Sequence, residues 1–289
     1  MAKFERSFPL ELQEALKSTD LYQKCLLPDI KSGEVFPAFR NNEIHFYHKG
    51  GRLFAFKGNV FKTDVNHASV LFWDRGKKDI EEPLLMSDNV RLIRNFSEGY
   101  QRIKDNCEHY AAGLEAKGSA KICSLSSYIS NQDIVILDAE VAFPESESSG
   151  RLDVDLLFFN KKERALRFFE AKHYSNSKLF SEQGAVVLAQ IREYTSQIIA
   201  RRDEILQAYK NYTQSARELF ELSEDALPTP EYVVEDVALL IFGFDEEQKR
   251  RLDEKLLKSG NLNGVYYRSI GDISTQTAAD VWNQTELGE

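Results

Sequence analysis

The fold depends on residues 151–173, which read RLDVDLLFFNKKERALRFFEAKH. The runs 151–160 and 165–173 are rich in aromatic and branched apolar residues, a composition typical of β-strands. The polar residues between them are too few for a crossover, so the two strands are predicted to be antiparallel neighbours. A third strand-like run, Asp133 to Phe143, precedes them and is joined through the polar loop Pro144 to Gly150.

The chain before this region predicts a small antiparallel sheet. Glu43 to His48 and Arg52 to Lys57 are β-type runs around a Lys-Gly-Gly turn, and Val60 to Thr63 adds a short third run. Leu10 to Leu21 has helical spacing. Glu81-Glu82-Pro83 marks a boundary, so we expect a β-rich recognition or docking module at 1–88 and a second domain at 89–289.

The second domain is predicted to alternate helices and strands. Apolar residues recur at helical spacing from Val90 to about Tyr128, where Gly118 interrupts or ends the first helix, and from Glu182 to Tyr212. The later segments are a strand, a helix with Asp245 as its N-cap, and a last strand: Val233 to Phe244, Asp245 to Ser259 and Gly264 to Ile270. This order predicts an α/β (α+β) fold, a mixed sheet with helices on its faces.

Composition excludes several classes of protein. The 289 residues are 42% hydrophobic and 29% charged, which is ordinary for a folded domain. No apolar run reaches the roughly 18–20 residues of a membrane span, so no membrane partner is expected. Met1 to Asp20 has no apolar signal stretch, which predicts a cytoplasmic protein. The three cysteines are one short of a four-cysteine metal or iron–sulfur site.

The net charge of −9 argues against a general nucleic-acid binder, which would carry a basic face. The acidity is concentrated late in the chain: residues 211–289 have 7 basic and 16 acidic side chains, whereas residues 151–210 have 11 and 8. We therefore expect weak, salt-sensitive binding to duplex, so that any action on nucleic acid would depend on a partner, an end or a particular structure.

Two strands carry the candidate catalytic and metal-binding residues. Side chains alternate along a strand, so Asp153 and Asp155 share one face, and Glu170 and Lys172 share a face of the next strand. The pairs can lie side by side, and such a density of carboxylates suits Mg²⁺. Gln190 and Tyr194 lie four apart on a predicted helix, on one face. They are placed to contact a phosphate backbone or to orient the lysine.

These elements resemble the PD-(D/E)XK nuclease superfamily. Asp153 followed by Glu170-Ala171-Lys172 at strand spacing is similar to its signature, and Gly150-Arg151-Leu152-Asp153 with Gln190-x-x-x-Tyr194 resembles its RecB-like branch. Leu152 stands where the superfamily has proline. The resemblance covers about residues 133–196 and implies a restriction-endonuclease-like mixed sheet flanked by helices.

The resemblance also implies residue roles. Asp153 and Glu170 would bind Mg²⁺, for which Mn²⁺ substitutes, and Lys172 would be the catalytic lysine beside Gln190 and Tyr194. The carbonyl of Ala171 would be a further metal ligand, because backbone oxygens also coordinate such ions. The additional upstream acid would be Glu140. Asp138 is the alternative, because alternation along the strand places both on the same face, and His109 is a weaker option.

The implied activity is a Mg-dependent phosphodiesterase acting as an endo- or exonuclease on DNA rather than RNA, in bacterial restriction or anti-phage defence. A protein partner or homo-oligomer is also expected. The alternative is a catalytically silent nuclease-fold subunit that binds nucleic acid or a partner protein, in which Glu170 and Lys172 form a structural ion pair.

Overall fold

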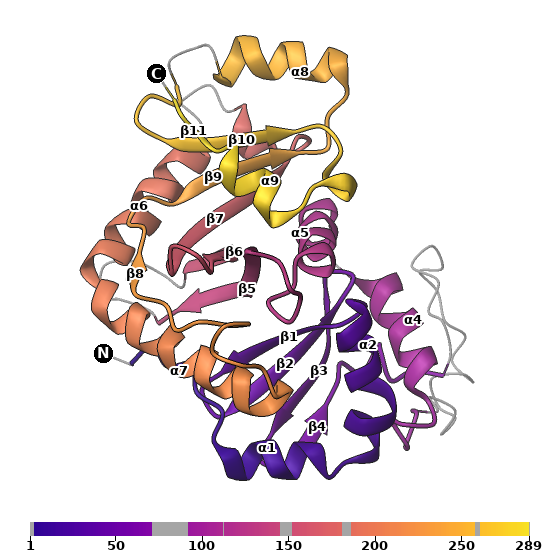
Figure 1. The fold of residues 1–289 in the computed structure, drawn as a ribbon. Helices are drawn as coiled ribbons and strands as arrows, with labels where there is room; N and C mark the ends of the chain where they lie inside the picture. The colour runs from indigo at the N-terminus through magenta and orange to yellow at the C-terminus, as the bar shows by residue number, and fades with distance from the viewer. Residues whose placement is uncertain are drawn as a thin grey trace.

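Two β-sheets organise the computed structural model, which describes residues 3–70, 92–111, 113–144, 152–180, 186–257 and 261–288. One sheet has four antiparallel strands and the other has seven strands in mixed orientation. They form the lower and upper halves of the molecule in Figure 1. This arrangement confirms the predicted α/β class with a β-rich N-terminal part.

The N-terminal sheet is a meander of neighbouring strands. Its members are β1 (Phe36–Arg40), β2 (Glu43–His48), β3 (Gly51–Lys57) and β4 (Val60–Lys62). Lys49 and Gly50 form the predicted turn between β2 and β3, and both have positive φ, as a tight hairpin turn requires. The chain enters through α1 (Leu10–Lys17), a π-helical turn (Tyr22–Leu26) and α2 (Leu27–Ser32).

The larger sheet is built around the predicted three-stranded meander. β5 (Ile134–Phe143), β6 (Leu152–Asn160) and β7 (Ala165–His173) are antiparallel neighbours, as expected. On its other side β7 pairs in parallel with β9 (Ala238–Phe242), and β9 pairs in parallel with β10 (Tyr266–Ile270). The edge strand β11 (Glu286–Leu287) is antiparallel to β10. β8 (Tyr232–Val233) pairs with the start of β7. The predicted strand from Val233 to Phe244 is thus two strands.

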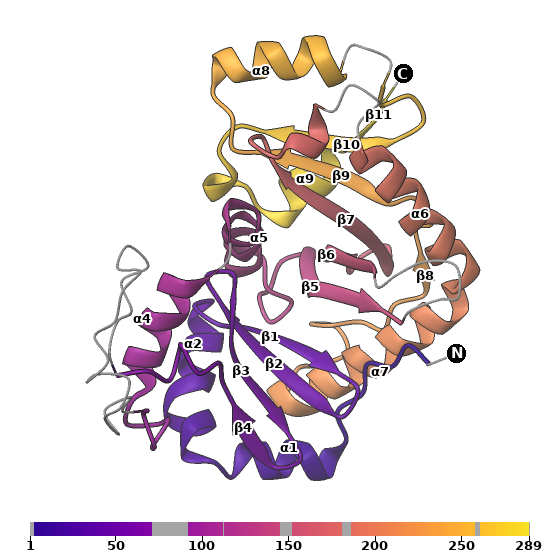
Figure 2. The same ribbon diagram turned by 180° about the vertical axis from the view of Figure 1, so that it is seen from behind.

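Helices flank the larger sheet. α6 (Val186–Ala200) and α7 (Arg202–Phe220) run along one side in both views (Figures 1 and 2). The predicted single helix over this region is wrong, because Arg201 between α6 and α7 leaves helical geometry with φ −119°. α8 (Glu246–Leu252) begins at Asp245, whose side chain forms the expected cap, and continues as a π-helical turn (Asp253–Leu257); α9 (Ala278–Asn283) follows.

α4 (Tyr100–Tyr110) and α5 (Leu114–Leu125) replace the helix predicted from Val90. The break lies near Ala111, where φ and ψ are no longer helical, and the prediction that Gly118 ends a helix is wrong. Gly118 sits inside α5, where a Cβ atom would lie 2.2 Å from the ring of Phe242 on β9. The glycine therefore serves packing, because it lets α5 approach the sheet closely.

The two sheets share one hydrophobic core. Phe39 of β1 meets Tyr212 of α7 with ring centroids 4.9 Å apart, and Phe36 meets Tyr128 at 5.8 Å. The N-terminal segment also docks on α7, because the backbone N–H of Phe4 donates to Glu204 over 2.6 Å. The boundary predicted near residues 81–88 lies outside the described residues.

Among the described residues, no helix has the length and apolar character needed to cross a membrane.

We expect Gly118→Ala to lower the free energy of unfolding by about 1–3 kcal/mol, because overpacking against Phe242 outweighs the gain in helix propensity of about 1 kcal/mol. Urea denaturation measures this change. Lys117→Ala, at the exposed preceding position of α5, is the matched control and should leave the midpoint nearly unchanged. A Gly118→Ala protein as stable as the wild type would contradict the packing role.

Candidate functional site

The motif residues of β6 and β7 lie where these two strands separate. The ladder between the strands ends at the pair Leu156 and Phe169, just before Asp155 on one strand and Glu170 on the other. Beyond that point the Asp155 carboxylate takes the place of a ladder acceptor, because its Oδ2 accepts from the backbone N–H of Ala171 over 2.7 Å. A polar site thus forms at a fork inside the sheet.

Glu170 and Lys172 form a buried pair at this fork. Their side chains are only 2% and 6% exposed, and Lys172 Nζ lies 2.5 Å from Glu170 Oε1. Lys172 also donates to the Ala171 carbonyl over 3.1 Å and lies 3.7 Å from Asp155 Oδ2. Glu115 of α5 completes the surroundings, with Oε2 3.8 Å from the same ammonium. One lysine therefore faces three carboxylates.

The carboxylates at the fork hold protons more tightly than usual. Burial and the charge of Asp155 raise the pKa of Glu170 to about 8. Burial also raises the pKa of Asp155, and Glu115 adds to that effect. Burial alone would lower the pKa of Lys172, but the charges of Glu170 and Asp155 outweigh it and raise that pKa. The site carries excess negative charge that its single ammonium does not balance.

Gln190 and Tyr194 lie beside the fork, as predicted. Gln190 Nε2 donates to Glu170 Oε1 over 2.9 Å and to the Tyr194 hydroxyl over 2.6 Å. The Tyr194 hydroxyl donates to the backbone carbonyl of Asp153 over 2.7 Å. One face of α6 therefore fixes both Glu170 and the β6 backbone, so side chains and backbone of β6, β7 and α6 meet at one place.

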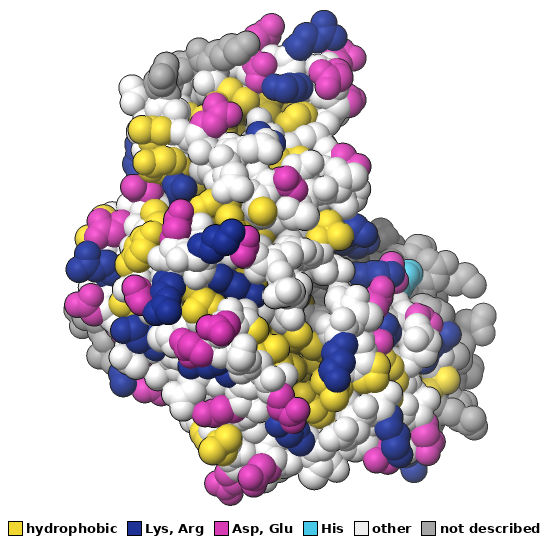
Figure 3. Space-filling view, in the orientation of Figure 1, with side chains coloured by type: hydrophobic (Ala, Val, Ile, Leu, Met, Phe, Trp, Pro, Cys, Tyr) yellow, Lys and Arg dark blue, Asp and Glu magenta, His cyan; other side chains and the backbone are white. Residues whose placement is uncertain are grey.

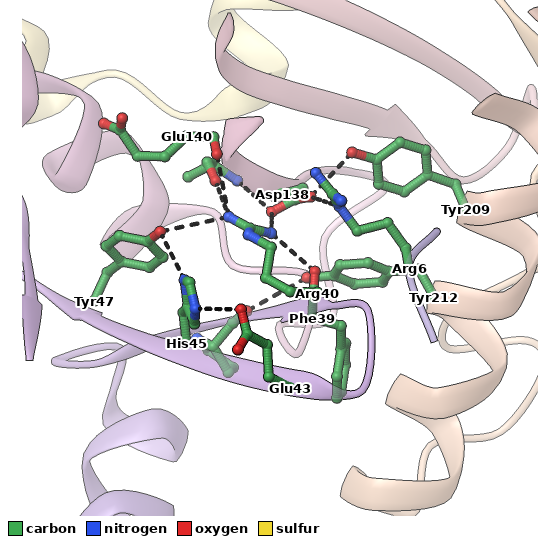
Figure 4. Close-up of polar contacts among 12 residues, drawn as sticks. Arg6, Phe39, Arg40, Glu43, His45, Tyr47, Asp138, Glu140, Tyr209 and Tyr212 are labelled. Atoms are coloured by element: carbon green, nitrogen blue, oxygen red, sulfur yellow. Dashed lines mark hydrogen bonds and ion pairs between the residues drawn. The ribbon is translucent and has the colours of Figure 1, made fainter. Parts of the chain in front are cut away.

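Asp138 and Glu140 have different environments, and the prediction that they share a face is wrong. Asp138 is fully buried, where it accepts from Arg40 Nη1 over 2.7 Å, from Arg6 Nε over 3.2 Å and from the Tyr209 hydroxyl over 2.9 Å. The side chain of Glu140 points away from this cluster (Figure 4). Its φ of +52° breaks the alternation of β5.

Glu140 is the upstream acid that lies toward the motif. Ala139 and Val141 pair with Leu156 and Val154, so Glu140 lies opposite Asp155. Desolvation and the charges of Asp155 and Asp153 raise the pKa of Glu140 to about 7. His109, the weaker option, lies exposed on α4 and lines neither of the hollows next to Glu140.

The N-terminal sheet takes part in this site through Arg40, which the sequence did not reveal. Besides binding Asp138, Arg40 Nη2 donates to the carbonyls of Ala139 over 2.6 Å and Glu140 over 3.3 Å. Arg40 thus holds the main chain of β5 where Glu140 adopts its unusual conformation. Glu115 was also missed, since neither residue has a local signal: each reaches the site only through tertiary packing.

The fit of the site to a divalent cation can be judged from its donors. Oε2 of Glu170 is buried and has no hydrogen-bond partner, and neither has Oε1 of Gln190. The raised pKa values of Glu140 and Glu170 indicate oxygens that a cation would favour in the charged form. The donor chemistry therefore fits Mg²⁺, although the described residues contain no preformed group of three or more metal-ligating side chains.

Comparison of the chain with models of known protein families, with curated proteins and with solved structures finds no match.

Asp138→Asn should lower the free energy of unfolding by about 3–5 kcal/mol, because it leaves Arg6 and Arg40 buried without a compensating charge. Glu140→Gln, two positions along the same strand, is the control. It should change the free energy of unfolding little, because the Glu140 side chain does not bind Arg6 or Arg40. Equal losses for the two variants in urea denaturation would refute this division of roles.

The raised pKa of Glu140 predicts a pH dependence of stability. Its pKa is about 7 in the folded chain and about 4.3 in an unfolded one. The folded chain therefore binds more protons between these values, and the free energy of unfolding falls as pH rises through them. In EDTA, we expect Glu140→Gln to lose less stability than the wild type between about pH 5 and pH 8.

The control for this measurement is Glu193→Gln, an exposed position of α6. Its urea midpoint should follow the wild-type pH profile. If Glu140→Gln follows that profile as well, Glu140 does not titrate in this interval.

Proposed function

We propose that the protein is a metal-dependent nuclease that hydrolyses phosphodiester bonds, with DNA as the preferred substrate. The observation that carries this proposal is the convergence of β6, β7 and α6 on one polar fork, where Gln190 and Tyr194 bind Glu170 and the backbone of Asp153. A fold needs no such set of buried polar contacts for stability alone, since ion pairs in the interior offset little of their desolvation cost.

The proposal assigns a task to each side chain. Asp153, Glu170 and Glu140, with the carbonyl of Ala171, would hold Mg²⁺. A bound Mg²⁺ supplies polarisation of a phosphoryl oxygen and a water of lowered pKa. Lys172 remains protonated because neighbouring carboxylates raise its pKa, so it can stabilise negative charge on the phosphate. Gln190 and Tyr194 are positioning residues that fix Glu170 and the β6 backbone.

Three observations favour the second candidate, a catalytically silent nuclease-fold subunit that binds nucleic acid or a partner protein. Lys172 and Glu170 already form a close, buried pair, and the described residues hold no preformed metal cluster. Acidic and basic side chains also intermix over the face seen in Figure 3, without one basic patch. Such a surface gives little non-specific affinity for duplex.

Cleavage assays separate the two candidates. With Mg²⁺, the wild type should cleave linear, circular or single-stranded DNA, and Lys172→Met should reduce the rate at least about 100-fold through lost charge stabilisation. Asp153→Asn and Glu170→Gln should have similar effects. Lys162→Met, in the exposed turn between β6 and β7, is the matched control. Undiminished cleavage by Lys172→Met would exclude the proposed role of this residue.

Metal binding can be tested without any substrate. Because the cation favours ionised carboxylates, Mg²⁺ or Mn²⁺ should raise the melting temperature more at about pH 8 than at about pH 5. At about a hundredfold excess over Kd the stabilisation is about 2.7 kcal/mol. Asp153→Asn should remove most of this shift. A wild-type protein with no shift at either pH would favour the silent subunit.

A further inference from the structure

The carboxylate site opens into a cleft of about 780 Å³ between the two sheets. Glu140, Ala142 and Asp153 line it on the side of the larger sheet. The N-terminal sheet provides the other side, through His45 and Tyr47 of β2 and Arg52 of β3. The proposed catalytic carboxylates therefore face a wall of different chemistry, contributed by a part of the chain that precedes them by about a hundred residues.

A second hollow of about 280 Å³ adjoins the first. The two share four lining residues: Tyr47, Gly50, Ala116 and Glu140. α5 lines the second hollow with Lys117 and Lys121, opposite the hairpin turn at Lys49. Figures 1 and 2 both place α5 at the junction of the two halves of the molecule. Glu140 thus lies at the middle of a polar groove that runs between the N-terminal sheet and α5.

Acidic and basic side chains both line the groove, and three of its cations are available to a ligand. Arg52, Lys117 and Lys121 are exposed and form no ion pair with another described residue. The other groove cations are engaged: Arg40 binds Asp138, and Lys49 lies 2.8 Å from Glu108 Oε2. Burial and the charge of Arg40 lower the pKa of His45 to about 4, so this ring is neutral near pH 7.

Tyr47 supplies an aromatic surface at the point where the hollows meet. Its hydroxyl lies within 3.5 Å of Arg40 Nη2 and 3.4 Å from His45 Nδ1, which fixes the ring in the groove wall. Tyr47 pairs with Arg52 across β2 and β3, so both side chains are on the same face. An aromatic ring beside cations that form no ion pair is typical of sites that hold a single nucleic-acid strand.

We propose that this groove binds a single nucleic-acid strand and presents its backbone to the carboxylates at Glu140 and Asp153. The inference deepens the proposed nuclease function by naming its substrate form. A hollow of about 780 Å³ is in the size range of clefts for small ligands, so it accommodates a nucleotide or two of one strand. A double helix is wider, because its two backbones stand on either side of a major groove about 12 Å wide, and it would need a more open protein surface.

Binding in the absence of cleavage tests this inference. Fluorescence anisotropy should be measured with a labelled single-stranded DNA, the corresponding RNA and a blunt hairpin duplex, in EDTA and again in Ca²⁺. We expect wild-type protein to bind one of the single strands at least about tenfold more tightly than the duplex. The two single-stranded arms show whether DNA or RNA is preferred. Equal affinity for strand and duplex, or no binding in either buffer, overturns the inference.

The groove variants are Arg52→Glu and Lys121→Glu. Each should weaken strand binding about three- to tenfold and reduce the slope of log affinity against log salt by about 0.7 per lost phosphate contact. Tyr47→Phe should retain most of the stacking that Tyr47→Ala loses. Lys255→Glu, an exposed charge reversal beyond α8, is the matched control. Wild-type affinity in either groove variant overturns the inference.

The same measurements distinguish this inference from the proposed function. If the protein binds the strand through Arg52 and Lys121 but never cleaves it, the strand-binding inference is supported and the proposed nuclease function is excluded. If the protein cleaves DNA while both charge-reversal variants bind the strand like the wild type, the nuclease function is supported and the strand-binding inference is excluded.

Discussion

The buried carboxylate of Asp138 is the contact on which the rest of the structure depends. It belongs to β5 of the larger sheet and binds Arg6 of the N-terminal segment, Arg40 of the N-terminal sheet and Tyr209 of α7. Four parts of the chain therefore meet at one charge. Because an unpaired charge in the interior is very costly, these parts can pack in few other ways, and the relative position of the two sheets is fixed.

The position of the two sheets in turn shapes the candidate site. While Nη1 of Arg40 binds Asp138, Nη2 donates to the carbonyls of Ala139 and Glu140. The interface that joins the sheets therefore also holds the main chain next to the carboxylate fork. The cleft exists because the N-terminal sheet stands opposite β5 and β6. In this chain of net charge −9, three exposed cations that form no ion pair with another described residue, Arg52, Lys117 and Lys121, line the hollows beside Glu140.

The sequence predicted the parts of the site that follow local rules. Strand alternation and a short turn were enough to bring Asp155 near Glu170, and helical spacing placed Gln190 and Tyr194 on one face. Glu140 and Asp138 could not be separated, because one residue with positive φ reverses the alternation. Gly118 was misjudged for a similar reason: its role depends on Phe242, more than a hundred residues away. Glu115 and Arg40 reach the site only through the assembled fold.

The docking of the N-terminal segment on α7 has a consequence for how the chain folds. The backbone N–H of Phe4 donates to Glu204, and that of Phe8 donates to the Ser215 hydroxyl, over sequence separations of 200 and 207 residues. Contacts of such separation form late, since a long loop must close first. During synthesis Phe4 and Phe8 leave the ribosome long before α7, so the N-terminal segment and the sheet that follows it acquire their final packing only after α7 has emerged.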